Sequence, residues 1–222
     1  MASEWLVDII ATIKLESGFT SQFHKDIVKE ITNKIKTQTQ NIKVDITDKI
    51  RTAVRKALVA TPEYQSIVQG KLKAELGIPN SDSRIVSIID TWVNNIVVSV
   101  KSSKSPFLAI EIGMIQSDYG DVLSLPAAEY RYSSQRGGGT IPWLTWLLLE
   151  GDKRIVARYE FSNNPRGSRT GMGIMIAKNK GAWQVPAQFS GTAVDNFATR
   201  ALDGIEHKID KIVEAVIKGR LK

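Results

Sequence analysis

The residue types that most often carry out chemistry are few and scattered in this chain. Its two histidines, His24 and His207, lie far apart, and neither belongs to an H-x-x-x-H or H-E-x-x-H pattern. In those patterns two imidazoles share one helix face and bind a metal ion. The 222 residues contain no cysteine, which excludes a disulfide, a thiolate metal site and a cysteine nucleophile. The sequence therefore predicts no metal site and places both histidines on the surface.

Carboxylates and glycines do not form a catalytic pattern either. Glu150 and Asp152 flank Gly151, but a glycosidase takes its two acids from converging elements around a sugar cleft. The glycines at 137–139 are not followed by the Gly-Lys-Ser/Thr of a phosphate loop. The segment "GSRTGMG" at 167–173 is glycine-rich, but no helix follows it, so it favours a hairpin turn. With no G-x-S-x-G motif, the sequence predicts a protein that is not an enzyme and binds no cofactor.

Composition and hydropathy indicate a folded protein outside the membrane. Hydrophobic residues make up 42% of the chain and charged residues 24%, which are ordinary globular values. The most apolar run, Ile141 to Leu149, is followed at once by charged residues and is shorter than the roughly 18 residues that a membrane span needs. The N-terminal "MASEWLVDIIATIKLES" has acids where a signal peptide has lysines, and it predicts an amphipathic helix.

The positive charge of the chain is concentrated near the N-terminus. The formal net charge is +7, and residues 25–56 hold nine Lys or Arg against four Asp or Glu. Such a stretch attracts nucleic acid or an acidic protein surface, or it is simply the solvated face of a helix.

A long helix is predicted between Phe19 and Leu58. Apolar residues recur every fourth position in two runs, at 19, 23, 27, 31 and 35 and then at 42, 46, 50, 54 and 58. This spacing is helical, and Thr61-Pro62 ends it. The polar "KTQTQN" at 36–41 can divide the helix into two. Because the stripe is longer than a small core needs, we expect it to pack on another helix or on a neighbouring subunit.

The remaining periodicities predict an α+β fold. Two further helices are expected at 62–76 and 84–96, and an amphipathic helix at 193–221. Strands are expected where the period changes to two, at 96–103, 106–116, 122–132, 154–162 and 172–177. We predict an antiparallel or mixed sheet of four to five strands packed by helices, with a helical N-terminal arm (1–60) and an α+β core (61–222) that ends in a long C-terminal helix.

The triple glycine and the tryptophans of the C-terminal half raise a separate expectation. Gly137 to Gly139 lead directly into a segment with Trp143 and Trp146. We expect the glycines to end a mobile loop and the tryptophan-rich segment to pack on the sheet or on the next subunit. Aromatic residues of this kind serve either core packing or subunit interfaces.

Several segments resemble one family of virion proteins. "TPEYQSIVQGKLKAELGIP", "IPWLTWLLLEGDKRIV", "SRTGMGIM" and "WQVPAQFSGTAVDNFATRALDGI" are similar to neck or tail-completion proteins of tailed bacteriophages, of the minor tail protein Z type. The resemblance covers residues 54–221 and is strongest from Gly137 to Ile205. The arm from Met1 to Asn41 departs from it and is expected to dock a partner that other members lack.

The resemblance implies a structural virion protein without enzymatic activity. It implies a ring of six copies at the junction of head and tail, which completes the tail and joins it to the head connector. The expected partners are other copies of this chain and neighbouring neck, connector, tail terminator, tail tube or sheath proteins, with non-specific contact to DNA in the lumen. The expected location is the virion, after assembly in the host cytoplasm. A tail terminator that caps the tail tube, and a basic nucleic-acid-binding module, remain alternatives.

Interaction residues are predicted in two regions. The predicted contacts of the C-terminal region are Trp143, Trp146, Arg169, Trp183, Phe189 and Arg200. Those of the arm are Lys25, Lys29 and Lys36. For each tryptophan, burial in the core is an equally good interpretation, and each lysine is also well explained as a solvated charge.

Overall fold

The computed structural model describes residues 6–12, 21–102, 107–113, 118–134, 137–164, 166–168 and 173–221. The chain divides into two compact units, each assembled from separate stretches. Unit 1 contains Met1–Ala53, Val93–Ser117 and Ile205–Lys222, and unit 2 contains Val54–Trp92 and Asp118–Gly204. This grouping differs from the sequence-based division at residue 60, because a central stretch and the C-terminal residues join the N-terminal residues in unit 1.

The long helix predicted from the four-residue spacing is present as a single element. Helix α1 runs from Ser21 to Val59 without a break at the polar segment, where the Thr37 hydroxyl donates a hydrogen bond of 2.9 Å to the Lys34 carbonyl. The second apolar run is fully buried, with 0% exposure at Ile42, Ile46, Ile50, Val54 and Leu58. This run therefore belongs to the core of its own chain, where α1 lies beside the C-terminal helix and Arg220 binds Asp45, so for this run the expected packing on another helix occurs within the chain.

Unit 1 contains a three-stranded antiparallel sheet in the order β1-β3-β2. Its strands are β1 (Leu6–Thr12), β2 (Val97–Ser102) and β3 (Phe107–Gly113), with Ile110 of β3 opposite both Ile9 and Val100. The predicted N-terminal amphipathic helix is wrong for 6–12. Those residues are rich in β-branched side chains, and pairing with β3, about 100 residues away, overrides the local helical pattern.

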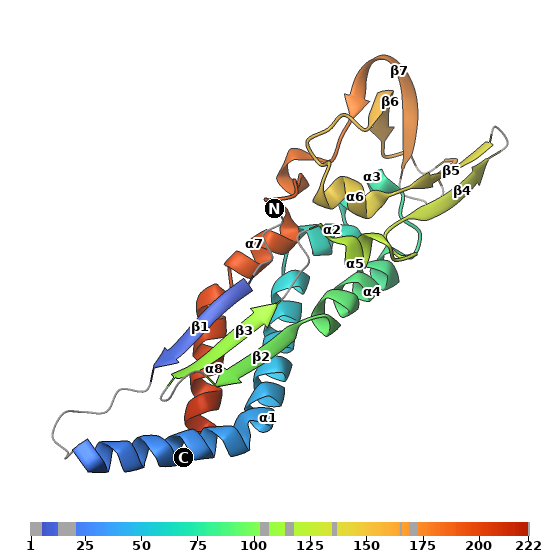
Figure 1. Ribbon diagram of the computed structural model, residues 1–222. Coiled ribbons are helices and arrows are strands. Elements are labelled where there is room, and N and C mark those ends of the chain that lie inside the picture. The colour runs from blue at the N-terminus through green and yellow to red at the C-terminus, as the bar shows by residue number, and fades with distance from the viewer. Residues whose placement is uncertain are drawn as a thin grey trace. The chain divides into compact units, whose positions relative to one another are not determined.

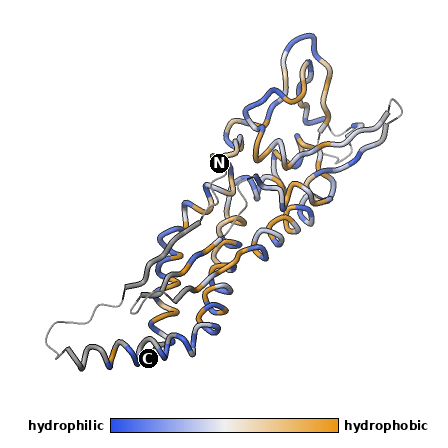
Figure 2. The backbone as a smooth tube through the Cα atoms, in the orientation of Figure 1, coloured by the Kyte–Doolittle hydropathy of each residue, from blue (hydrophilic) through white to orange (hydrophobic). Residues whose placement is uncertain are grey.

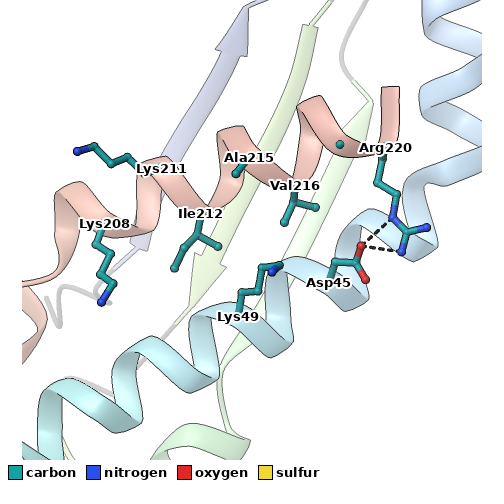
Figure 3. A pocket seen from close by; sticks show the side chains of 9 residues that line it. Asp45, Lys49, Lys208, Lys211, Ile212, Ala215, Val216 and Arg220 are labelled. Atoms are coloured by element: carbon teal, nitrogen blue, oxygen red, sulfur yellow. Dashed lines mark hydrogen bonds and ion pairs between the residues drawn. The ribbon is translucent and has the colours of Figure 1, made fainter. Parts of the chain in front are cut away.

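Two helices cover this sheet. Helix α8 (Glu206–Leu221) and the second half of α1 lie along one face of the strands (Figures 1 and 3). Hydrophobic and hydrophilic residues alternate along α8 in Figure 2, as expected for a helix with one buried face. The core of unit 1 is formed by buried residues of these elements and of the adjoining stretch: Ile42, Ile46, Ile50, Ala53, Val93, Ile96, Val98, Ile110, Ile112, Ile209, Val213 and Val216.

The single C-terminal helix predicted at 193–221 is two helices. Helix α7 (Phe197–Asp203) begins after the capping residue Asn196 and ends at Gly204, and α8 begins two residues later. The apolar spacing is continuous through this break, so the hydrophobic pattern alone does not mark it. Asn196 makes a capping box with Thr199, and this signal places the true start of α7.

Unit 2 begins with short helices in place of one long one. Helix α2 (Pro62–Gln69) starts at the capping Thr61, whose hydroxyl accepts from the Tyr64 N–H. Gly70 then takes an extended conformation, and α3 (Lys71–Leu76) follows. A Cβ atom at Gly70 would lie 2.7 Å from the Ser66 Cα, so only glycine fits this close turn. Helix α4 (Ser81–Asn94) comes next and is the helix predicted at 84–96.

The strands of unit 2 form two separate hairpin sheets. Strand β4 (Tyr130–Ser134) pairs with β5 (Gly137–Ile141), and β6 (Val156–Ser162) pairs with β7 (Ile174–Trp183). The predicted α+β class is thus confirmed, but among the described residues no sheet reaches four strands. One reason is that the strand predicted at 122–132 is replaced over most of its length by the short helix α5 (Gly120–Leu123) and turns.

The triple glycine lies in a strand and not in a loop. Gly137 to Gly139 belong to β5, where Gly139 is paired with Tyr132 of β4. A Cβ at Gly139 would meet the Tyr132 ring at 3.0 to 3.2 Å, so the ring covers the space that a side chain would fill. An aromatic side chain opposite a strand glycine is a known way to stabilise such a position. The tryptophan-rich segment then forms helix α6 (Trp143–Leu148).

A hydrogen-bonded polar centre lies within the core of unit 2. Asn196 is 0% exposed, and its side-chain N–H groups donate to the Tyr119 hydroxyl at 2.7 Å and to the Thr192 carbonyl at 2.9 Å. Its side-chain oxygen accepts from the backbone N–H groups of Ala198 and Thr199. Burial raises the pKa of Tyr119, and the hydrogen bond from Asn196 only partly opposes this.

The raised pKa of Tyr119 predicts a loss of stability in alkali. Above about pH 10, the ordinary tyrosine pKa, the unfolded chain loses the phenolic proton while the folded chain keeps it. Stability from this group is therefore complete below about pH 10 and falls as the pH rises toward the folded-state pKa. Urea unfolding at about pH 8 and about pH 11 measures how far the free energy of unfolding falls between these two values. The fall should be smaller for Tyr119→Phe than for the wild type. Equal decreases would contradict the assignment to Tyr119.

Candidate interaction surface

Most of the predicted C-terminal contact residues lie inside unit 2. Trp143 is 0% exposed and its indole N–H donates to the Ala127 carbonyl at 2.9 Å. Trp183 and Phe189 are each 7% exposed, and the Trp183 indole donates to the Glu75 carboxylate at 3.2 Å. Trp146 is half-buried and contacts Trp183 edge to face, with 6.3 Å between the ring centroids. These side chains pack within unit 2. Arg169 lies outside the described residues.

Arg200 is engaged within its own unit. Its guanidinium binds the buried Glu63 carboxylate at 2.6 Å and the exposed Asp195 carboxylate at 2.6 Å. Burial alone would lower the pKa of Arg200, but the hydrogen bonds and charges of Glu63 and Asp195 outweigh it and raise that pKa. The residue holds α7 to the first turn of α2, and it neutralises a carboxylate that is almost fully enclosed.

The predicted arm residues lie on α1, in the half that precedes its buried run. Lys29 and Lys36 are exposed. Lys25 is part of the helix, and its side chain is outside the described set. None of the described side chains from Asp26 to Asn41 is buried, whereas from Ile42 onward every fourth residue is. The described side chains of this half of α1 are therefore exposed or half-buried, and Lys29 and Lys36 add positive charge to its surface.

A groove of about 560 Å³ lies between α1 and α8 within unit 1 (Figure 3). Asp45 and Lys49 of α1 form one side of it. The other side is formed by residues of α8: Lys208, Lys211, Ile212, Ala215, Val216, Gly219 and Arg220. Because both walls are helices and the residues between them are small or apolar, the groove has an apolar floor with charged edges.

The charge on the groove is strongly positive. Four cationic side chains line it against a single carboxylate, Asp45. Asp45 is already bound by Arg220, with Nε and Nη2 at 2.7 and 2.6 Å from the same oxygen. This ion pair joins α1 to α8 at one end of the groove. Lys49, Lys208 and Lys211 have no carboxylate partner among the described residues, so their charges are available to a ligand.

Small residues open the α8 side of the groove. Ala215 and Gly219 are four residues apart, hence on one face of the helix, and both are exposed. A Cβ atom at Gly219 would meet nothing within 4 Å. Glycine inside a helix costs about 0.5–1 kcal/mol relative to alanine. The packing within unit 1 gives no reason for glycine at this position.

Comparisons with family models, curated proteins and solved structures give no match.

The described residues do not form a metal-binding cluster. They include no group of three His, Asp or Glu side chains placed to bind a metal. Glu150 is paired with Lys153 at 2.9 Å, and His207 is exposed on α8. Within the residues that the structure describes, no helix is both long enough and apolar enough to cross a lipid bilayer.

Sequence reasoning found the lysines of α1 but missed the groove. The groove is lined by segments that are distant in sequence, since Asp45 and Arg220, which form an ion pair at one end of it, lie 175 positions apart in the chain. Only two local signals pointed toward it, the lysines of the last helix and the glycine near its end. Neither signal identifies the surface against which α8 packs.

Proposed function

We propose that this protein is a structural component of a tailed-bacteriophage virion. Six copies form a ring at the neck, complete the tail and join it to the head connector. The observation that carries the proposal is the first half of α1, a helical extension with exposed lysines and no buried side chain among its described residues. Together with the resemblance to neck and tail-completion proteins, this extension supports a protein that works through contacts with its neighbours.

The apolar pattern of α1 supports an external partner for its first half. A separate run with the same four-residue spacing, which includes Phe23 and Ile27, precedes the run that contains the buried Ile42. Ile27 is only half-buried. A helix face of this kind gains stability when a second surface covers it, and in the proposed ring that surface belongs to an adjacent subunit.

The small sheets are also consistent with assembly. Strands β1 and β2 form the two edges of the sheet in unit 1, and neither has a further strand partner among the described residues. The β6–β7 hairpin leaves Tyr159 and Ile176 about 40% exposed, and a two-stranded hairpin is marginally stable alone. In the proposed ring, strands of adjacent subunits pair with these edges.

The proposal predicts a defined assembly that depends on the first half of α1. Native mass measurement should find a ring of six copies, or a complex with co-expressed neck proteins. Ile27→Glu should shift the protein at least tenfold toward monomer, because a charge would enter the subunit contact. Val44→Glu is the matched control, since Val44 lies on α1 and is 46% exposed. A wild-type chain that stays monomeric and joins no phage particle would exclude this function.

A basic nucleic-acid-binding module is the second candidate, favoured by the exposed Lys29 and Lys36. A monomer that binds duplex DNA with an affinity falling steeply with salt, and less steeply after Lys29→Gln and Lys36→Gln, would support it over assembly. A tail terminator that caps the tail tube would form a ring as well, and its position in the particle would distinguish it.

A further inference from the structure

We infer that the groove between α1 and α8 is a docking site for an acidic amphipathic helix of a partner protein. The inference rests on the proposed function only in that a neighbouring virion protein would supply this helix. The groove is formed by residues of unit 1 alone, whereas the described residues among the predicted C-terminal contacts belong to unit 2.

The spacing of the lining residues fits a helix. Along α8 the groove is lined at positions 208, 211, 212, 215, 216 and 219. These intervals of three and four residues are those with which one helix presents a continuous stripe to another. An amphipathic partner would place its apolar stripe over Ile212, Ala215 and Val216, as helices do in hydrophobic grooves.

The charge of the edges selects an acidic partner. Lys49 stands on the α1 side, and Lys208 and Lys211 stand on the α8 side, so carboxylates on both flanks of a bound helix would meet an ammonium group (Figure 3). Complementary charge of this kind sets orientation and speeds association. A nucleic acid would satisfy the lysines, but its charged backbone would leave the apolar floor uncovered.

Gly219 gives an independent reason for close approach. Glycine is unfavourable in a helix relative to alanine, and apart from the neighbouring backbone of α8 itself no described atom lies within 4 Å of the position that a Cβ would take. Small residues at positions four apart allow two helix backbones to approach closely. Ala215 and Gly219 therefore fit a helix that lies directly on α8, and larger side chains there would hold it away.

Binding of a defined peptide to the full chain tests the inference. The probe is a fluorescein-labelled synthetic helix of about 18 residues, roughly five turns, with Leu and Ala on one face and Glu on both flanks. We expect saturable binding with a micromolar Kd, and no binding of the same peptide with Lys in place of Glu. Equal binding of both peptides would overturn the requirement for an acidic partner.

Two variants separate seating in the groove from simple attraction to a basic surface. Gly219→Leu should abolish binding of the peptide, because the leucine side chain would occupy the groove. The unfolding temperature should stay unchanged or rise, because a Cβ at this position points into open space. Lys211→Glu should weaken binding about fivefold to tenfold. Lys218→Glu is the matched control on α8, since Lys218 is exposed, bound to Glu214 and outside the groove, and it should change binding by less than about twofold.

The outcomes are distinct for the inference and for the proposed function. If Gly219→Leu binds the acidic peptide as the wild type does, the helix does not lie in the groove and the inference is overturned. The inference is also overturned if the peptide does not bind and duplex DNA binds instead, with an affinity that Lys211→Glu lowers. If the peptide binds as expected but the chain joins no particle, the docking site stands and the phage function fails. If the peptide fails to bind while rings form, the inferred docking site is overturned and the proposed phage function stands.

Discussion

Replacement of Asn196 by alanine is expected to lower the free energy of unfolding by about 3 kcal/mol. The loss has two parts. Removing the N-cap of α7 costs about 1 kcal/mol, and leaving its buried partners unsatisfied costs a further 1–3 kcal/mol. The capped groups are the N–H groups of Ala198 and Thr199, and the other buried partners are the Tyr119 hydroxyl and the Thr192 carbonyl, to which the Asn196 amide donates. Urea unfolding followed by circular dichroism measures the change.

Asn196→Asp is the informative companion variant. It keeps the side-chain oxygens that cap α7 but loses the donors that face the Thr192 and Leu148 carbonyls. A carboxylate in this buried position is disfavoured, so its pKa should be raised and the folded state should bind the proton more tightly than the unfolded state. Stability relative to the wild type should then recover as the pH falls toward the ordinary aspartate pKa of about 4. If both variants lose less than about 0.5 kcal/mol at neutral pH, the polar centre has no stabilising role.

Gly151→Ala is expected to have the second large effect, a loss of about 3 kcal/mol or failure to fold. Gly151 donates its N–H to the Gly191 carbonyl at 2.9 Å, and a Cβ at Gly151 would lie 2.4 Å from the Gly191 nitrogen. Gly191 is equally confined, since its own Cβ would lie 2.5 Å from the Leu147 carbonyl oxygen. Because the obstacles are backbone atoms, no side-chain rotation relieves the overlap, and two segments of unit 2 must separate.

Gly219→Ala is the control for this prediction. Its added Cβ meets open space inside a helix, so the same chemical change should stabilise the protein by up to about 1 kcal/mol. Thermal and urea unfolding of both variants should show changes of opposite sign. Equal and small changes would mean that the two chain segments at Gly151 and Gly191 are not in close contact.

The candidate surface was predictable from the sequence only in its charges. The lysines of α1 follow from counting residues, and their exposure agrees with a helix half that carries no buried side chain. The aromatic residues chosen for the C-terminal contact region were a poorer guide. Trp143, Trp183 and Phe189 are buried because unit 2 folds α3, α6 and the end of β7 around them, and composition does not reveal which aromatic residues are enclosed.

Local periodicity determined the class of the fold and its longest element. The four-residue spacing placed α1 correctly through Leu58, and the two-residue alternation located β2, β3 and β6, because a helix and a strand impose their own repeat on nearby residues. Tertiary structure decided everything that depends on distant partners. Residues 6–12 form β1 only through pairing with β3, the glycines of β5 are held against Tyr132, and the groove exists only because α8 packs beside Asp45 of α1. Contact energies between segments far apart in the sequence leave no repeat in either segment, so the sequence alone could not determine these features.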